Sequence, residues 1–159
     1  MDTGKPATQL YRRSHFVTHL PVNYLFSPSH FWIAPAPDKP GLWRVGLTKF
    51  ASRMLGEMVD LGLDPAPDAP VEPGQTLGWV EGFKAISDVY CIARGSFAGV
   101  NPALREKISL INKDCHGAGW LYAVRGDPGP QCLDMPAYRA LLDKTIDKIL
   151  EQQKGTEIQ

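Results

Sequence analysis

The stretch EGFKAISD, residues 81–88, places one lysine, Lys84, between a glycine-containing segment and small or apolar residues. Apolar residues lead into it over 77–80, and a second run of strand-forming residues leads out of it over 88–92. Two such runs around a short turn predict a β-hairpin. Lys84 then lies near the tip of this hairpin, with its amine exposed on a rigid platform. That arrangement is what a covalently modified lysine needs.

The rest of the chain reads as short strands separated by turns. The 15 glycines and 14 prolines among 159 residues predict many turns and few long helices. Thr48 and Asn101 are expected to begin short helices, because their side-chain oxygens can accept a free backbone amide. Apolar residues at helical spacing predict one longer amphipathic helix over 134–153. Further strands are expected at 30–33, 42–47, 58–63, 95–100 and 117–124, with a proline-rich loop at 64–74.

Composition and charge argue against several classes of partner. The 17 Lys and Arg residues balance the 17 Asp and Glu residues, so no electrostatic reason exists to expect nucleic acid or an anionic membrane. No apolar run approaches the roughly 20 residues that a membrane-spanning helix needs. Residues 1–13 lack apolar periodicity and an apolar signal core, and they are expected to form a flexible N-terminal tail.

Cysteine and histidine usage indicates a reducing compartment and no metal site. Cys91, Cys115 and Cys132 are odd in number and form no CxxC pair, so a disulfide scaffold is not expected and the cytoplasm is the predicted location. His15 and His19 lie four residues apart. Without a matching group of carboxylates or cysteines, they do not predict a metal site.

The order of motifs over residues 27–125 resembles that of the glycine cleavage H-protein family. The hairpin sequence Glu81-Gly82-Phe83-Lys84-Ala85 is similar to the family's Glu-Ser-Val-Lys-Ala. One such match is weak, but an ordered set is specific. The other matching motifs are His30-Phe31-Trp32, Val45-Gly46-Leu47-Thr48, Leu55-Gly56, Ser87-Asp88-Val89-Tyr90, Asn101, Ile111-Asn112 and Gly119-Trp120.

The resemblance implies a mainly β fold, a barrel-sandwich hybrid of two antiparallel sheets with short peripheral helices. A carrier domain at 14–127 would be followed by the C-terminal amphipathic helix at 134–153, packed on it. The resemblance also implies lipoic acid in amide linkage on Lys84 and no catalysis by the protein itself, because the cofactor supplies the chemistry. The implied partners are a lipoate-protein ligase or lipoyl transferase, dihydrolipoamide dehydrogenase, and either the glycine cleavage enzymes or a heterodisulfide-reductase-like complex.

Several residues are expected to surround the lipoyl arm. Glu81 and Asp88 are either polar turn residues or contacts that the ligase recognises. His30 is carried over from the resemblance to a cleft that shelters the loaded arm, although it can equally be a structural histidine. The remaining expected cofactor-binding residues are Gly82 and Phe83.

Cys91 carries a second hypothesis. It lies on the strand that leaves the hairpin, where an exposed thiol could exchange with the lipoyl disulfide. Strand alternation can instead bury this side chain, and a buried free cysteine is commonly inert.

Departures from the family pattern cluster around the arm and bear on the pathway. Gly82-Phe83 stands in place of Ser-Val, and Cys91-Ile92 stands where the family usually has a proline. Residues 60–63 read Asp-Leu-Gly-Leu where an acidic residue and a proline are usual. In these features the hairpin is similar to H-like lipoate-binding proteins of sulfur-oxidising systems, which favours a specialised carrier in sulfur oxidation. The alternatives are an aminomethyl carrier of glycine cleavage and an unmodified H-like binding domain.

Overall fold

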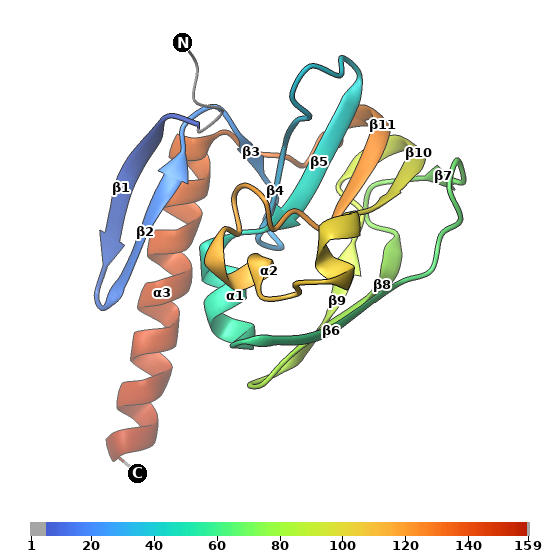
Figure 1. The fold of residues 1–159 in the computed structure, drawn as a ribbon. Helices are drawn as coiled ribbons and strands as arrows, with labels where there is room; N and C mark the ends of the chain where they lie inside the picture. The colour runs from blue at the N-terminus through green and yellow to red at the C-terminus, as the bar shows by residue number, and fades with distance from the viewer. Residues whose placement is uncertain (1–5, 159) are drawn as a thin grey trace.

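The computed structural model describes residues 6–158 and is mainly β (Figure 1). Two antiparallel sheets form the sandwich, as predicted. The smaller sheet has the order β6 (Met58–Leu63), β8 (Thr76–Gly82) and β9 (Ile86–Tyr90). The larger sheet has the order β3 (Leu25–Phe26), β4 (Phe31–Pro35), β5 (Leu42–Leu47), β11 (Tyr122–Pro128), β10 (Ala93–Val100) and β7 (Pro70–Val71).

The inner faces of the two sheets bury one continuous apolar core. Leu77, Val80 and Val89 of the smaller sheet meet Val45 and Val124 of the larger one. An irregularity in β8 between Thr76 and Gly78 brings Leu77 onto the same face as Val80. All five side chains are fully buried. Burial of each such side chain contributes about 1.5–3 kcal/mol. This core holds β8 and β9 in place and therefore fixes the base of the lysine hairpin.

The short helices begin where their capping residues predict. The Thr48 hydroxyl accepts a hydrogen bond from the Ala51 amide at the start of α1 (Lys49–Leu55), which ends at Gly56. The Asn101 side chain accepts one from Ala103 at the start of the 3-10 helix η1 (Pro102–Arg105). A last short helix, α2 (Leu110–Lys113), precedes β11.

The prediction of a flexible tail over residues 1–13 is wrong for residues 8–13. They form β1 (Thr8–Arg13), which pairs antiparallel with β2 (Phe16–Pro21). Residues 1–5 lie outside the described part of the chain. Tyr11 is the one fully buried side chain of β1, so the strand shows no alternation of apolar and polar residues in the sequence.

The C-terminal helix α3 (Met135–Ile158) starts within one residue of its predicted position and ends five residues beyond it. The Asp134 carboxylate caps its start by accepting the Ala137 amide. The helix and the β1–β2 hairpin lie side by side at one edge of the sandwich (Figure 1). Together they enclose a second core, which contains Tyr11, Leu20, Phe26, Trp32, Phe50, Tyr138, Leu142 and Ile146. Among residues 6–158, no helix combines the length and apolar character that a membrane span requires.

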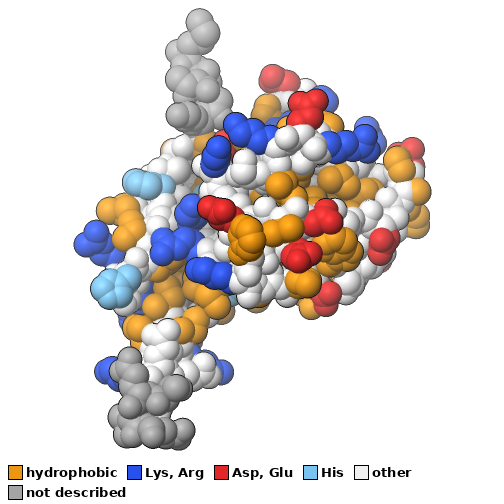
Figure 2. All heavy atoms as spheres, turned by 60° about the horizontal axis from the view of Figure 1, so that its bottom comes forward, with side chains coloured by type: hydrophobic (Ala, Val, Ile, Leu, Met, Phe, Trp, Pro, Cys, Tyr) orange, Lys and Arg blue, Asp and Glu red, His pale blue; other side chains and the backbone are white. Residues whose placement is uncertain are grey.

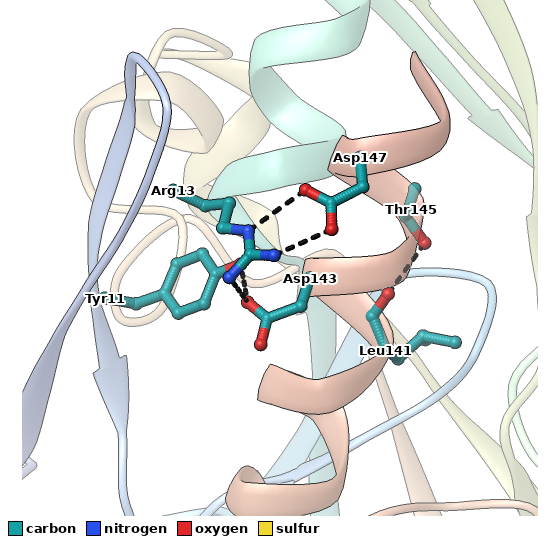
Figure 3. A network of polar contacts seen from close by, with 6 residues as sticks. All are labelled: Tyr11, Arg13, Leu141, Asp143, Thr145 and Asp147. Atoms are coloured by element: carbon teal, nitrogen blue, oxygen red, sulfur yellow. Dashed lines mark hydrogen bonds and ion pairs between the residues drawn. The ribbon is translucent and has the colours of Figure 1, made fainter. Parts of the chain in front are cut away.

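Polar contacts join the β1–β2 hairpin to α3 (Figure 3). The Tyr11 hydroxyl donates to Asp143 at 2.8 Å, and the Arg13 guanidinium donates to both oxygens of Asp147, at 2.7 and 3.1 Å. The Arg13 and Asp147 side chains are 41% and 50% exposed, so solvent screens this ion pair and its contribution to stability is small. These contacts mainly orient a hairpin that the second core already holds.

Candidate functional site

Lys84 lies at the tip of the hairpin formed by β8 and β9, as predicted. Glu81 pairs with Ile86 at the end of the ladder, and the Gly82 amide donates to the Ala85 carbonyl at 2.9 Å to close the turn. Lys84 is exposed, and the neighbouring Phe83 side chain is 79% exposed. The amine therefore extends from the molecule on a closed, hydrogen-bonded turn.

The backbone at the end of α1 accepts two hydrogen bonds from this turn. The Lys84 amide donates to the Leu55 carbonyl, and the Phe83 amide donates to the Glu57 carbonyl, each at 2.9 Å. Both donors lie in the turn and cannot be used within the β8–β9 ladder. The backbone of the lysine is thus fixed while its side chain stays exposed. No residue pattern indicates this support, because backbone carbonyls accept these hydrogen bonds and any residue type supplies a carbonyl.

Two glycines allow α1 and the hairpin to approach this closely. A Cβ atom on Gly82 would lie 2.2 Å from the Leu55 carbonyl oxygen, which no real structure tolerates. Gly56 has a φ of +83°, and a Cβ there would lie 3.0 Å from Cγ of Lys84. Gly82 stands where the family motif has serine. In this structure a side chain larger than hydrogen at position 82 would meet the Leu55 carbonyl.

Substitution of Gly82 by alanine should loosen this contact. The new methyl group has to displace the end of α1, since its nearest neighbours are backbone atoms of Leu55. We expect a loss of about 1–3 kcal/mol in the free energy of unfolding, measured by urea denaturation. Hydrogen exchange of the Phe83 and Lys84 amides should also accelerate. Gly155→Ala is the matched control because its Cβ would meet open space. Equal free energies of unfolding for Gly82→Ala and Gly155→Ala would contradict a close contact between Gly82 and Leu55.

The Asn112 side chain forms hydrogen bonds with the connection between α1 and β6. Its side-chain oxygen accepts the Met58 amide at 2.9 Å, and its side-chain nitrogen donates to the Gly56 carbonyl at 3.0 Å and to the Ser52 hydroxyl at 3.2 Å. An amide side chain can replace a missing backbone partner in this way. In the sequence, Asn112 was recognisable only as a member of the family motif, and its supporting role was missed.

The outward face of the smaller sheet combines acidic and apolar side chains beside Lys84. Trp79 pairs with Asp88, and Glu81 pairs with Ile86, so these four residues share one face of the hairpin. The Trp79 ring covers Gly62 of β6. Figure 2 looks onto the lower side of the molecule, where apolar side chains are interspersed with acidic ones. The tip surface is defined here as Trp79, Glu81, Phe83, Ile86 and Asp88. Exposed apolar side chains gathered in this way are typical of a recognition surface.

His30 lies among aromatic residues at the start of α3. Its Nδ1 atom is 2.8 Å from the Tyr138 hydroxyl, and its ring centroid is 4.7 Å from that of Phe50. The Tyr138 hydroxyl donates to Thr48 at 3.0 Å, so the His30 ring is the donor in its own bond. Burial lowers the pKa of His30 to about 4. These contacts join β4, α1 and α3, and a role for His30 in sheltering the arm stays a prediction.

The burial of Cys91 argues against thiol exchange in the folded protein. Its side chain is 0% exposed, and its thiol donates to the Ala93 carbonyl at 3.0 Å. Burial also raises the pKa of the Cys91 thiol, so the reactive thiolate is disfavoured. Cys115 is buried as well, and burial raises its pKa to about 11. The geometry thus favours the inert alternative for Cys91, and Cys115 is protected in the same way.

The site has the chemistry of an attachment point. The turn is held by hydrogen bonds and presents an exposed primary amine. Such an amine can form an amide with the carboxyl group of a cofactor arm. The stem of Lys84 lies beside Gly56. The tip surface around it offers apolar and acidic contacts to any enzyme that must recognise the turn.

Comparison with known proteins gives a consistent result. The family model described as glycine cleavage H-protein matches residues 24–140. The glycine cleavage system H protein of Corynebacterium jeikeium is 37% identical over 125 residues, which cover 78% of this chain and 98% of that protein. The protein of the same name from Pseudoalteromonas atlantica is 31% identical over 131 residues, covering 80% and 99%.

A solved structure agrees with these sequence comparisons. The crystal structure of a glycine cleavage system H protein from Mycobacterium marinum superposes with a TM-score of 0.67 at 32% identity, and the match covers 76% of this chain and 97% of the other. The β1–β2 hairpin precedes the residues that the family model matches, and most of α3 follows them.

Proposed function

Because the chain belongs to the glycine cleavage H-protein family, we propose that it is a lipoyl carrier with lipoic acid in amide linkage on Lys84. The observation that supports this proposal most directly is the turn at Lys84, whose backbone is held by hydrogen bonds. Its two central amides bond to the Leu55 and Glu57 carbonyls while the lysine side chain stays exposed. A ligase or lipoyl transferase can reach such an amine, and partner enzymes can receive the arm that it bears.

The residues of the chain position the arm, and the cofactor supplies the dithiol chemistry. The clamped backbone fixes the point from which the arm extends, so tethering raises its effective concentration at each partner's active site. Phe83 and Ile86 provide apolar contact area at the tip. Glu81 and Asp88 provide negative charge, which favours partners with basic residues around their active-site entrances. The protein therefore acts as a substrate for its partners and performs no catalysis of its own.

The relatives favour glycine cleavage as the pathway. The relatives named above all bear the name of a glycine cleavage H protein. We therefore propose an aminomethyl carrier that works with the glycine cleavage enzymes and dihydrolipoamide dehydrogenase. The sulfur-oxidation hypothesis rests on the departures at Gly82, Phe83 and Cys91, and none of these relatives supports it. The cytoplasm is the proposed location, supported by the free state of Cys91, Cys115 and Cys132.

Loading by glycine distinguishes the proposed pathway from its alternatives. The lipoylated protein is incubated with glycine and a glycine decarboxylase, and its intact mass is measured before and after. We expect a gain of one aminomethyl group on the lipoylated form and no gain on the unlipoylated form. A protein that accepts lipoate but gains nothing from glycine would contradict the glycine cleavage assignment. Loading by sulfur compounds would then be measured in its place.

A further inference from the structure

A cavity of about 660 Å³ lies between β2, the β4–β5 pair and the segment 112–118, and its lining includes no residue of the lysine hairpin. Cationic side chains outnumber acidic ones around it. Arg44, Lys49 and Lys113 line it together with one carboxylate, Asp114. The Asp114 carboxylate is already used within its own turn, since it accepts the Ala118 amide at 2.9 Å. The cavity therefore presents an excess of positive charge.

The three cations are available to a ligand. Within the described residues, the ion pairs of the protein involve none of them. The Arg44 guanidinium lies 4.7 Å from the centroid of the Trp120 ring, a contact that leaves its charge unneutralised. The Lys49 ammonium donates to the Asn112 carbonyl at 3.3 Å. Lys113 is exposed at the rim.

Part of the cavity lining is apolar. It contains the rings of Tyr24 and Trp32, whose centroids are 4.9 Å apart, together with Pro21, Pro35 and Pro37. Sites for small molecules typically combine such apolar surface with a few charged groups that fix the orientation of the ligand. The arrangement here suits a molecule that carries an anionic group on an apolar body.

Hydrogen bonds join Tyr24 and Trp32 to the segment 112–118. Tyr24 donates to the His116 carbonyl and Trp32 donates to the Cys115 carbonyl, each at 2.7 Å. The His116 ring accepts the Lys49 amide at 3.3 Å and makes a backbone hydrogen bond with His19 of β2. The cavity is therefore formed before any ligand binds, which lowers the cost of ordering on binding.

One wall of the cavity comes from a segment that the family model does not match. Thr18, His19 and Pro21 of β2 line it, and all three precede residue 24. We propose that this cavity is a binding site for a small organic anion, in which a carboxylate, sulfonate or phosphate group meets Arg44, Lys49 and Lys113 while an apolar body rests against Tyr24. The site is separate from the lipoyl attachment point, so the proposal does not depend on the function proposed for Lys84.

The site is tested by titrating the full-length protein with phenyl phosphate and recording the backbone amide chemical shifts. The titration is done at about 0.15 M salt, where non-specific surface attraction is largely screened. We expect saturable shifts centred on residues 112–118 and β2, with a Kd of about 1 mM or tighter. Inorganic phosphate alone should bind more weakly, because it lacks the apolar body. Benzylamine is the control of similar shape and opposite charge. Shifts that are centred elsewhere, or benzylamine binding of equal strength, would overturn the proposal.

Charge variants add a second readout. Lys113→Glu is expected to weaken phenyl phosphate binding about tenfold, since it reverses one of three charges at the rim. Lys113 is exposed, so this variant should keep its fold, which the dispersed amide spectrum reports. Lys148→Glu makes the same change at an exposed position on α3, away from the cavity lining, and should bind like the unsubstituted protein. Equally weakened phenyl phosphate binding in both variants would show a general charge effect and overturn the proposed site.

Discussion

Replacement of Lys84 by arginine is expected to reduce glycine turnover to the level measured without the carrier. Arginine preserves the positive charge and the length of the side chain. Its guanidinium stays protonated and cannot serve as the amine in an amide with lipoic acid. The measurement is CO₂ release from glycine in a system reconstituted with the other glycine cleavage enzymes. This is the largest effect that the structure predicts, because the loss removes the cofactor itself.

The same variant should keep the stability of the unsubstituted protein. Lys84 is exposed, and the hydrogen bonds of its turn are made by backbone atoms, which arginine also has. Substitutions at such surface positions usually change the free energy of unfolding by no more than about 0.5 kcal/mol. Lys144→Arg, at an exposed position on α3, is the matched control and should retain full turnover. Full turnover by the Lys84 variant would mean that another residue bears the cofactor.

Acidification from pH 7 to 4.5 is expected to remove about 4 kcal/mol of folding free energy through two half-buried histidines. Burial lowers the pKa of His30 to about 4. Burial, followed by the charge of Lys49, lowers the pKa of His116 to about 4. In the unfolded chain both rings titrate near pH 6.5. Between the two pKa values the unfolded state binds protons that the folded state does not, so stability is complete above about pH 6.5 and falls as pH decreases toward 4.

The size of this effect follows from the shift of each pKa. One pKa unit corresponds to about 1.4 kcal/mol, so each histidine has an upper limit of about 3 kcal/mol. Since both side chains keep some exposure, about 2 kcal/mol for each is the expected loss. A change of this size is a large part of the 5–15 kcal/mol that usually stabilises a domain.

Urea denaturation at several pH values separates the two contributions. The stability of His30→Gln and His116→Gln should each depend about half as steeply on pH as that of the unsubstituted protein. The slope is the relevant quantity, because glutamine also disturbs the hydrogen bonds of each ring at neutral pH. An unchanged slope in both variants would show that these histidines do not titrate in the way that their burial implies.

The elements nearest the lysine were the most predictable from sequence. The hairpin depends on local turn chemistry and on alternation over 77–92, and both signals lie in one short window. The caps at Thr48 and Asn101 depend on the residue type at one position. In each case the deciding interaction joins residues close in the sequence, so the residue pattern records it.

The elements that were missed depend on contacts between distant segments. β1 buries Tyr11 against α3, about 130 residues away along the chain, and its other residues carry no strand pattern. The support of the lysine turn comes from the Leu55 and Glu57 carbonyls, which belong to no particular residue type. The cavity beside Trp32 likewise forms only where β2 meets the segment 112–118. A single sequence holds no local signal for any of these arrangements.

The intact mass of the protein after incubation with lipoate, ATP and a lipoate-protein ligase tests the central claim most directly. The structure predicts a gain of one lipoyl group, which peptide mapping places on Lys84 within residues 81–88. The Lys84→Arg variant should gain nothing under the same conditions. A protein that stays unmodified, or that gains its lipoyl group on a different lysine, would contradict the assignment of this hairpin as the carrier site.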